Sequence, residues 1–196
     1  MASQVEIANV SLGLCGSARI NAVTEDSKGA QYVNQFWALA RQFCLSAHPW
    51  NFALKRRSLA SQTTDPTFEW AYAFPLPEDC LRAWQVGNPE DEIEWRVEMV
   101  GEGDNAVKCI VTNESTCNLL YVYDVTDTGR WSPYFAVAMA YYLAVWLCFP
   151  ITADDAWVQR LEVAAERMLG KAKAADAQEG TPENIMTSDW ENARLV

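Results

Sequence analysis

Apolar residues recur at helical spacing near both ends of the chain, and the clearest run lies between residues 26 and 47. Spacings of three and four positions are typical of a helix with one face on a core. A shorter helix is predicted over residues 4–15, with Gly16 at its C-terminal end. The longer helix should end near Ala47, because Pro49 disfavours helical geometry at the residue before it. The predicted core stripe of this helix consists of Ala30, Val33, Trp37, Ala40, Cys44 and Ala47, widened by Phe36 and Phe43.

Between residues 50 and 125 the spacing of apolar residues changes to two, which is typical of strands. The short turns between the segments favour an antiparallel meander of five or six strands. Pro75 and Pro77 should place their strand at a sheet edge or end it. The segments predicted as strands are 50–54, 70–76, 81–86, 95–100, 107–111 and 119–125.

Helical spacing returns after residue 130, and residues 131–149 contain no charged side chain. We interpret this run as a helix packed on all sides rather than a membrane span. Its uninterrupted part would cover roughly 26 Å, less than the ~30 Å hydrocarbon core of a bilayer. Asp154 or Asp155 should begin another amphipathic helix, which carries Trp157, Leu161 and Met168 on its stripe and ends near residue 174.

These elements predict an α+β fold, in which a small α-helical bundle from both ends of the chain carries an inserted, mainly antiparallel β-sheet region. The predicted boundaries are 1–48 for the N-terminal helices, 49–129 for the β-sheet insertion and 130–174 for the C-terminal helices. Residues 175–196 are polar and are expected to form an extended tail.

Composition narrows the classes of function. Half of the residues are hydrophobic, which argues against a disordered chain. The formal charge of −11 opposes tight wrapping of duplex DNA, which needs clustered cations. The first residues carry neither a basic nor a long apolar segment, so no secretory leader is expected and synthesis in a reducing cytosol is predicted.

The six cysteines and the single histidine give no metal-binding pattern. No two cysteines form a CxxC pair, and one histidine excludes a two-histidine metal site within one chain. Cysteines scattered among apolar positions are typical of small buried side chains. We therefore expect no disulfide, no metal and no cofactor.

Three polar features could carry chemistry, and each also has a structural interpretation. The cations Lys55, Arg56 and Arg57 could contact phosphate, but such a run also deters pairing at a strand edge. The acidic segment 90–94 could bind calcium or act in acid–base catalysis, but it lacks the glycine of a calcium loop and suits a solvated turn. His48 could be a general base, yet no nucleophile motif accompanies it. The sequence therefore predicts no enzyme.

The nine tryptophans, together with the acidic residues, also resemble the composition of sugar-binding proteins. Trp84 and Trp95 are the candidates for such a site. Four others lie on predicted core stripes and are expected to be packing residues: Trp37, Trp50, Trp70 and Trp157.

Four segments together resemble a known family. Residues 48–53 read His-Pro-Trp-Asn-Phe-Ala and follow a helix ending in Ala-Arg-Gln-Phe-Cys-Leu at 40–45. Residues 72–82 read Tyr-Ala-Phe-Pro-Leu-Pro-Glu-Asp-Cys-Leu-Arg, and residues 8–16 open the pattern with Ala-Asn-Val-Ser-Leu-Gly-Leu-Cys-Gly. In order and spacing, over residues 5–170, they resemble the tail tubular protein A family, the head-to-tail adaptors of short-tailed, podovirus-type phages.

The resemblance implies a structural virion protein of the viral tail, made in the host cytoplasm. Members of this family are similar in forming a ring, thought to be dodecameric. The ring lies between the portal protein above and the tail nozzle (tubular) protein below, and DNA passes through it during ejection without specific binding. It also implies that the terminal segment reaches toward the portal, and no membrane is expected among the partners. Carbohydrate binding or carbohydrate-directed activity in a virion, or a host-interaction module, are the alternative functions.

If the chain is an adaptor, as the resemblance implies, the tail is its predicted contact region. Its polar composition should not fold alone, whereas a few spaced apolar residues are typical of folding on a partner. Trp190 is the strongest single candidate for a hot spot on the portal or a neighbouring subunit. The proposed contact residues are Ile185, Met186, Trp190 and Leu195.

Overall fold

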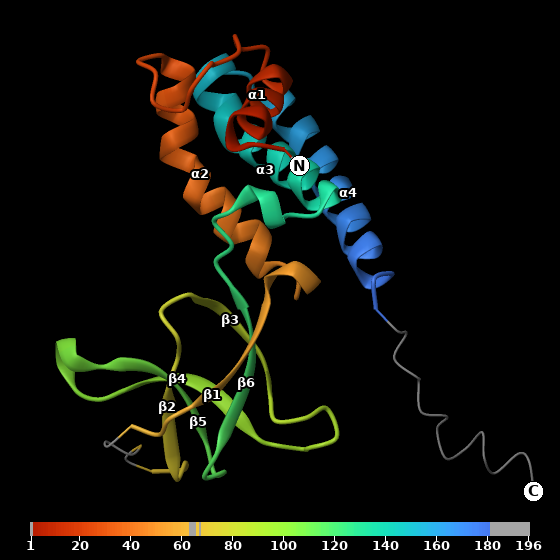
Figure 1. The fold of residues 1–196 in the computed structure, drawn as a ribbon. Helices are drawn as coiled ribbons and strands as arrows, with labels where there is room; N and C mark the ends of the chain where they lie inside the picture. Colours follow the sequence, from red (N-terminus) through yellow and green to blue (C-terminus); the bar gives the residue numbers. More distant parts are fainter. Residues whose placement is uncertain (1, 63–65, 67, 181–196) are drawn as a thin grey trace, which may run out of the picture.

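The computed structural model describes residues 2–62, 66 and 68–180. In this part of the chain the predicted α+β fold is confirmed, with helices at one end of the molecule and strands at the other (Figure 1). The helices are α1 (Gln4–Leu14), α2 (Lys28–Ser46), α3 (Pro133–Thr152) and α4 (Asp155–Ala177). The strands are β1 (Leu54–Leu59), β2 (Tyr72–Pro75), β3 (Cys80–Val86), β4 (Trp95–Val100), β5 (Val107–Thr112) and β6 (Cys117–Tyr123).

Each helix begins at a side chain that accepts a hydrogen bond from a backbone N–H group of the first turn, which would otherwise lack a partner. Ser3 Oγ accepts from Glu6, whose carboxylate accepts from the Ser3 N–H group in return. The remaining caps are Ser27 for α2, Ser132 for α3 and Asp154 for α4. At the other end of α1, Gly16 has a φ of 70°, which glycine adopts without strain.

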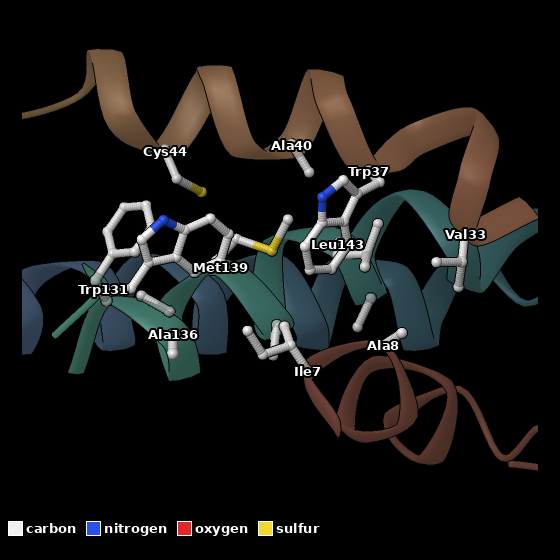
Figure 2. Packing of buried hydrophobic residues seen from close by; sticks show 14 of the residues in the cluster. Ile7, Ala8, Val33, Trp37, Ala40, Cys44, Trp131, Ala136, Met139 and Leu143 are labelled. Carbon is white, nitrogen blue, oxygen red and sulfur yellow. The ribbon is translucent and has the colours of Figure 1, made fainter. Parts of the chain in front are cut away.

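The helical core forms around α3, which packs against α1, α2 and α4 (Figure 1). The α2 stripe faces it, and Trp37 stacks on Trp131 with ring centres 6.0 Å apart (Figure 2). Small side chains let α1 approach closely, so the buried Ser11 Oγ donates to the Ala140 carbonyl at 2.8 Å.

The strands form two three-stranded antiparallel sheets, ordered β1-β6-β3 and β2-β5-β4. The predicted antiparallel pairing is confirmed, but the single meander is wrong. Phe74 and Ile110 of the second sheet share one buried cluster with Leu119 and Tyr121 of the first. Two sheets that cover each other bury apolar side chains which one open sheet would leave in water. β2 is an edge strand and ends at Pro75, as predicted.

The segment after α2 also differs from its prediction. Residues 51–53 form a 3₁₀ turn instead of the start of a strand, and β1 begins only at Leu54. The cause is Trp50, which is fully buried in the helical core and donates from Nε1 to the Cys44 carbonyl at 3.0 Å. An apolar residue that packs on helices does not need the alternating geometry of a strand.

A largely buried ion pair joins the helical and β parts. Arg41 of α2 donates from Nε and Nη2 to the two carboxylate oxygens of Asp124, at 2.7 and 2.8 Å, just beyond β6. Gln42 adds a bond to the same carboxylate at 3.0 Å. Burial alone would raise the pKa of Asp124, but these hydrogen bonds hold it below its ordinary value.

Candidate functional site

The predicted contact residues Ile185, Met186, Trp190 and Leu195 lie outside the described residues. The start of the predicted tail is corrected, because α4 continues through Ala177 and residues 175–177 are helical. Asp176, expected in a polar tail, is only 4% exposed. Its carboxylate accepts the backbone N–H group of Asn51 at 3.1 Å, and its carbonyl accepts Asn51 Nδ2 at 2.8 Å.

His48 belongs to the same arrangement. Its Nε2 lies 3.3 Å from Asp176 Oδ2. Burial lowers the pKa of His48, against the attraction of the Asp176 carboxylate. These contacts tie the last turn of α4 to the chain between α2 and β1. The Asp176 carboxylate is thus occupied by structural contacts, which gives His48 a positional role in the fold.

α3 is not packed on all sides, so that prediction is wrong. Among the described residues α3 is the one helix long and apolar enough to cross a membrane, and half of its most apolar stretch is buried. Tyr134, Val137 and Phe149 are exposed. Three neighbouring helices cannot enclose a central helix completely, so apolar side chains remain at the surface on both sides of α4.

The first exposed surface, which we call the aromatic ridge, lies along α2 and α3. Phe43 packs against Tyr142 at 5.2 Å and against Trp146 at 6.1 Å between ring centres. Phe36 meets Trp146 at 6.3 Å. The ridge consists of Phe36, Leu39, Phe43, Tyr142 and Trp146. Leu39 and Phe43 are 57% and 50% exposed, so Phe43 does not widen the core stripe as predicted but stands at its rim.

The second surface is an apolar hollow of about 380 Å³ between α1 and the start of α3. Val10 and Val137 line it and are 49% and 45% exposed. A neighbouring depression continues from Val137 toward α4. The apolar hollow is lined by Ala2, Glu6, Ile7, Val10, Thr128, Trp131, Pro133, Ala136, Val137 and Ala140.

The helices that carry these surfaces are almost uncharged. From residue 29 to residue 47 the only charged side chain is Arg41, which is buried against Asp124, and α3 has none. On a chain with a formal charge of −11, such a surface is unusual. Its lack of charge is the signal in the sequence that points to a contact surface, together with the apolar residues Leu39 and Phe43 beside the stripe.

The cations Lys55, Arg56 and Arg57 lie on β1, which is an edge strand as predicted. Lys55 Nζ lies 2.6 Å from Asp79 Oδ2 and 3.7 Å from the centre of the Tyr123 ring. Arg56 and Arg57 are exposed. Lys55 therefore forms an ion pair, whereas Arg56 and Arg57 are solvated at the strand edge.

The acidic residues of the segment 90–94 are exposed in the turn before β4. Asp91 accepts the backbone N–H group of Asn88 at 2.8 Å and so closes the turn. Within residues 2–62, 66 and 68–180, no three His, Cys, Asp or Glu side chains are grouped to hold a metal ion.

Of the tryptophans expected in the core, Trp37 and Trp50 are buried. Trp157 is 39% exposed, so its prediction is wrong; its Nε1 donates to the Leu14 carbonyl at 3.0 Å. The sugar-site candidates lie on different sheets, Trp84 on β3 and Trp95 on β4. Trp84 lies under the Arg82 guanidinium at 5.0 Å, whereas Trp95 packs against the cluster between the sheets.

Five of the six cysteines are buried and Cys80 is half-buried, which agrees with their predicted packing role. Burial raises the pKa of Cys15 and of Cys44 to about 12, and that of Cys117 to about 11. At neutral pH these side chains are protonated thiols and poor nucleophiles.

No protein-family model and no curated protein sequence matches the chain. The chemistry of the aromatic ridge and the apolar hollow is therefore the basis for assigning a function.

Proposed function

We propose that this protein is a structural subunit of a phage tail: an adaptor ring that joins the portal to the tail nozzle and forms part of the DNA conduit. The observation that carries the proposal is the pair of separate, nearly uncharged apolar surfaces on the helical part. A subunit that repeats around a ring needs two different contact surfaces, because each copy touches one neighbour on either side. The resemblance of residues 5–170 to the tail tubular protein A family supports the same function.

The charge of the chain is compatible with a conduit. Phosphates held by strong cation contacts would resist movement, whereas an acidic subunit repels DNA. The same acidic residues also favour solubility. In this proposal residues 181–196 reach the portal, with Trp190 as the central contact.

The test is assembly on phage heads. Purified protein is mixed with portal-bearing heads that lack the adaptor and examined by negative-stain electron microscopy. The expected result is a ring at the portal vertex that then accepts the nozzle protein. Heads that stay bare at saturating protein concentration would contradict the proposal.

A further inference from the structure

Two surfaces of the helical part are left uncovered by the rest of residues 2–62, 66 and 68–180, and their shapes differ. The aromatic ridge projects from α2, with Leu39 and Phe43 at least half exposed. The apolar hollow is concave and lies between α1 and α3. Val137 in the hollow and Tyr142 in the ridge are five positions apart, which at 3.6 residues per turn places them about 140° apart around α3.

We propose that the aromatic ridge of one copy of this chain docks into the apolar hollow of the next copy. The contact is head-to-tail, so each copy offers its ridge to one neighbour and its hollow to the other. This inference rests on the proposed ring and names the surfaces that build it. Contact surfaces on nearly opposite sides of a subunit are what a closed ring of many copies requires.

Electrostatics restricts a contact between two copies to their uncharged surfaces. Two molecules with a formal charge of −11 repel each other wherever their acidic surfaces meet. The exposed residues of α2 around the ridge are neutral: Gln31, Asn34, Gln35 and Ala38. α3 adds no charge, but α4 places a charged side chain beside each surface: Glu166 acts electrostatically on Tyr142 of the ridge, and Lys171 lines the depression next to the hollow. Both side chains are exposed, so ridge and hollow can meet while these two charges stay in water at the rim. At the rim of the hollow, Glu6 is already bonded to Ser3 in the helix cap.

Shape favours ridge against hollow over ridge against ridge. A contact between two ridges would close at two copies and leave both hollows open to water. In the head-to-tail contact Leu39 and Phe43 supply the projecting side chains, while Val10 and Val137 line the cavity that receives them. Aromatic and aliphatic side chains that enter such a cavity are typical hot spots of interfaces.

The experiment uses two full-length variants, each with one surface blocked by charge. Leu39→Glu blocks the ridge and Val137→Glu blocks the hollow. Each variant alone should associate at least about 30-fold more weakly than the natural chain, the effect of losing a hot-spot side chain. A mixture of the two should form one-to-one dimers and no larger species, because a single intact ridge then meets a single intact hollow. Analytical ultracentrifugation measures the species.

Val163→Glu is the matched control, because Val163 is 53% exposed on α4 and belongs to neither surface. This variant should assemble like the natural chain. Circular dichroism and thermal melts of all three variants establish that they are folded. If the Val137→Glu variant does not fold, Val10→Glu replaces it at the same hollow.

Several results would overturn the inference. Normal assembly of the Leu39→Glu variant would show that the ridge is not a contact surface. Dimers formed by the Val137→Glu variant alone would show that two ridges pack against each other. For a chain that is monomeric in solution, a photo-reactive residue at position 39 is cross-linked at millimolar concentration and the adducts are mapped. Adducts at Val10 or Val137 of another copy support the contact. Adducts within residues 181–196, or none, contradict it, as does binding of the monomer to phosphatidylglycerol vesicles through the ridge.

The outcome is separable from that of the proposed function. If the variant mixture forms dimers but the natural protein does not bind portal-bearing heads, the contact between copies is supported and the adaptor function is rejected. If the Leu39→Glu variant still forms rings on heads, the adaptor function is supported and the contact through the ridge is rejected.

Discussion

The nine tryptophans occupy very different environments. Trp50 is fully buried, with its ring 5.0 Å from that of Phe135, and Trp37 stacks on Trp131. Trp84 and Trp157 are 40% and 39% exposed. The same residue type thus stabilises the helical core at some positions and remains at the surface at others. The energetic consequence depends on how much of each ring is removed from water.

Replacement of a core tryptophan should be costly. Trp50→Ala or Trp37→Ala should lower the free energy of unfolding by about 3–5 kcal/mol, because each leaves a large cavity between packed helices. Urea unfolding followed by circular dichroism measures the change. Trp84→Ala is the control and should cost about 0.5 kcal/mol or less. Equal unfolding midpoints for all three variants would show that Trp37 and Trp50 are not core residues.

At the scale of elements, two buried polar arrangements hold parts of the chain that are far apart in sequence. Arg41 and Asp124 join α2 to the end of β6, and Asp176 joins the last turn of α4 to Asn51. In both cases a carboxylate is largely removed from water. That of Asp124 accepts from Arg41 and Gln42, and that of Asp176 accepts the Asn51 N–H group with both oxygens and lies 3.3 Å from His48 Nε2. Such groups fix the relative positions of elements, because leaving either partner unpaired is unfavourable.

The Arg41–Asp124 pair should make stability depend on acid pH. The pKa of Asp124 is lower in the folded protein than its ordinary value of 3.8, so the stabilisation is complete above that value and is lost as the pH falls below it. Arg41→Met should cost about 2 kcal/mol at neutral pH and flatten the loss of stability below pH 4. Thermal melts between pH 3 and pH 7 measure both effects. Arg130→Met, which breaks an exposed pair with Asp127, should leave the midpoint nearly unchanged; an equal loss in the two variants would contradict the prediction.

The end of α4 makes two truncations distinguishable. Removal of residues 181–196 should leave the thermal midpoint nearly unchanged but abolish attachment to portal-bearing heads, because it removes the predicted contact residues. Removal of residues 176–196 should also lower the midpoint, because Asp176 and its bonds to Asn51 are lost. Asp176→Ala in the full chain should reproduce that drop. Normal attachment of the shorter truncation to heads would reject the tail as the portal contact.

At the scale of the whole molecule, the helices and the sheets lie at opposite ends, joined where β1 and β6 meet the helical part (Figure 1). The buried helical cluster extends to Val122 and Val125 at that end of β6. A continuous apolar core together with the Arg41–Asp124 pair therefore supports the fold at this junction. Cys15, Cys44 and Cys148 contribute to the helical core as buried thiols.

Stability should therefore be independent of metal ions and of redox state. The protein is expected to melt at the same temperature with and without EDTA, and with and without dithiothreitol, because all six cysteines are free thiols. Differential scanning calorimetry makes the comparison in a single buffer. A drop of many degrees with either reagent would reveal a stabilising metal or disulfide and defeat the prediction.

Local patterns were sufficient for much of this fold. The spacing of Val33, Trp37 and Ala40 identified the buried side of α2, and Asp154 was one of the two predicted starts of α4. These features depend on residues within one or two turns of each other, so the sequence alone determined the helices, most strands and the α+β class. The absence of charge from α3, and from residues 29–47 apart from Arg41, was also visible in the sequence.

Tertiary structure decided which apolar residues find a partner. The period of a helix reports which residues share a side, but whether that side is covered depends on how many other elements reach it. The helices α1, α2 and α4 do not cover the whole surface around α3. Apolar side chains such as Phe43, Val137 and Trp157 are therefore exposed. The pairing of strands into two sheets and the burial of Asp176 likewise depend on contacts between residues far apart in sequence, which no local pattern encodes.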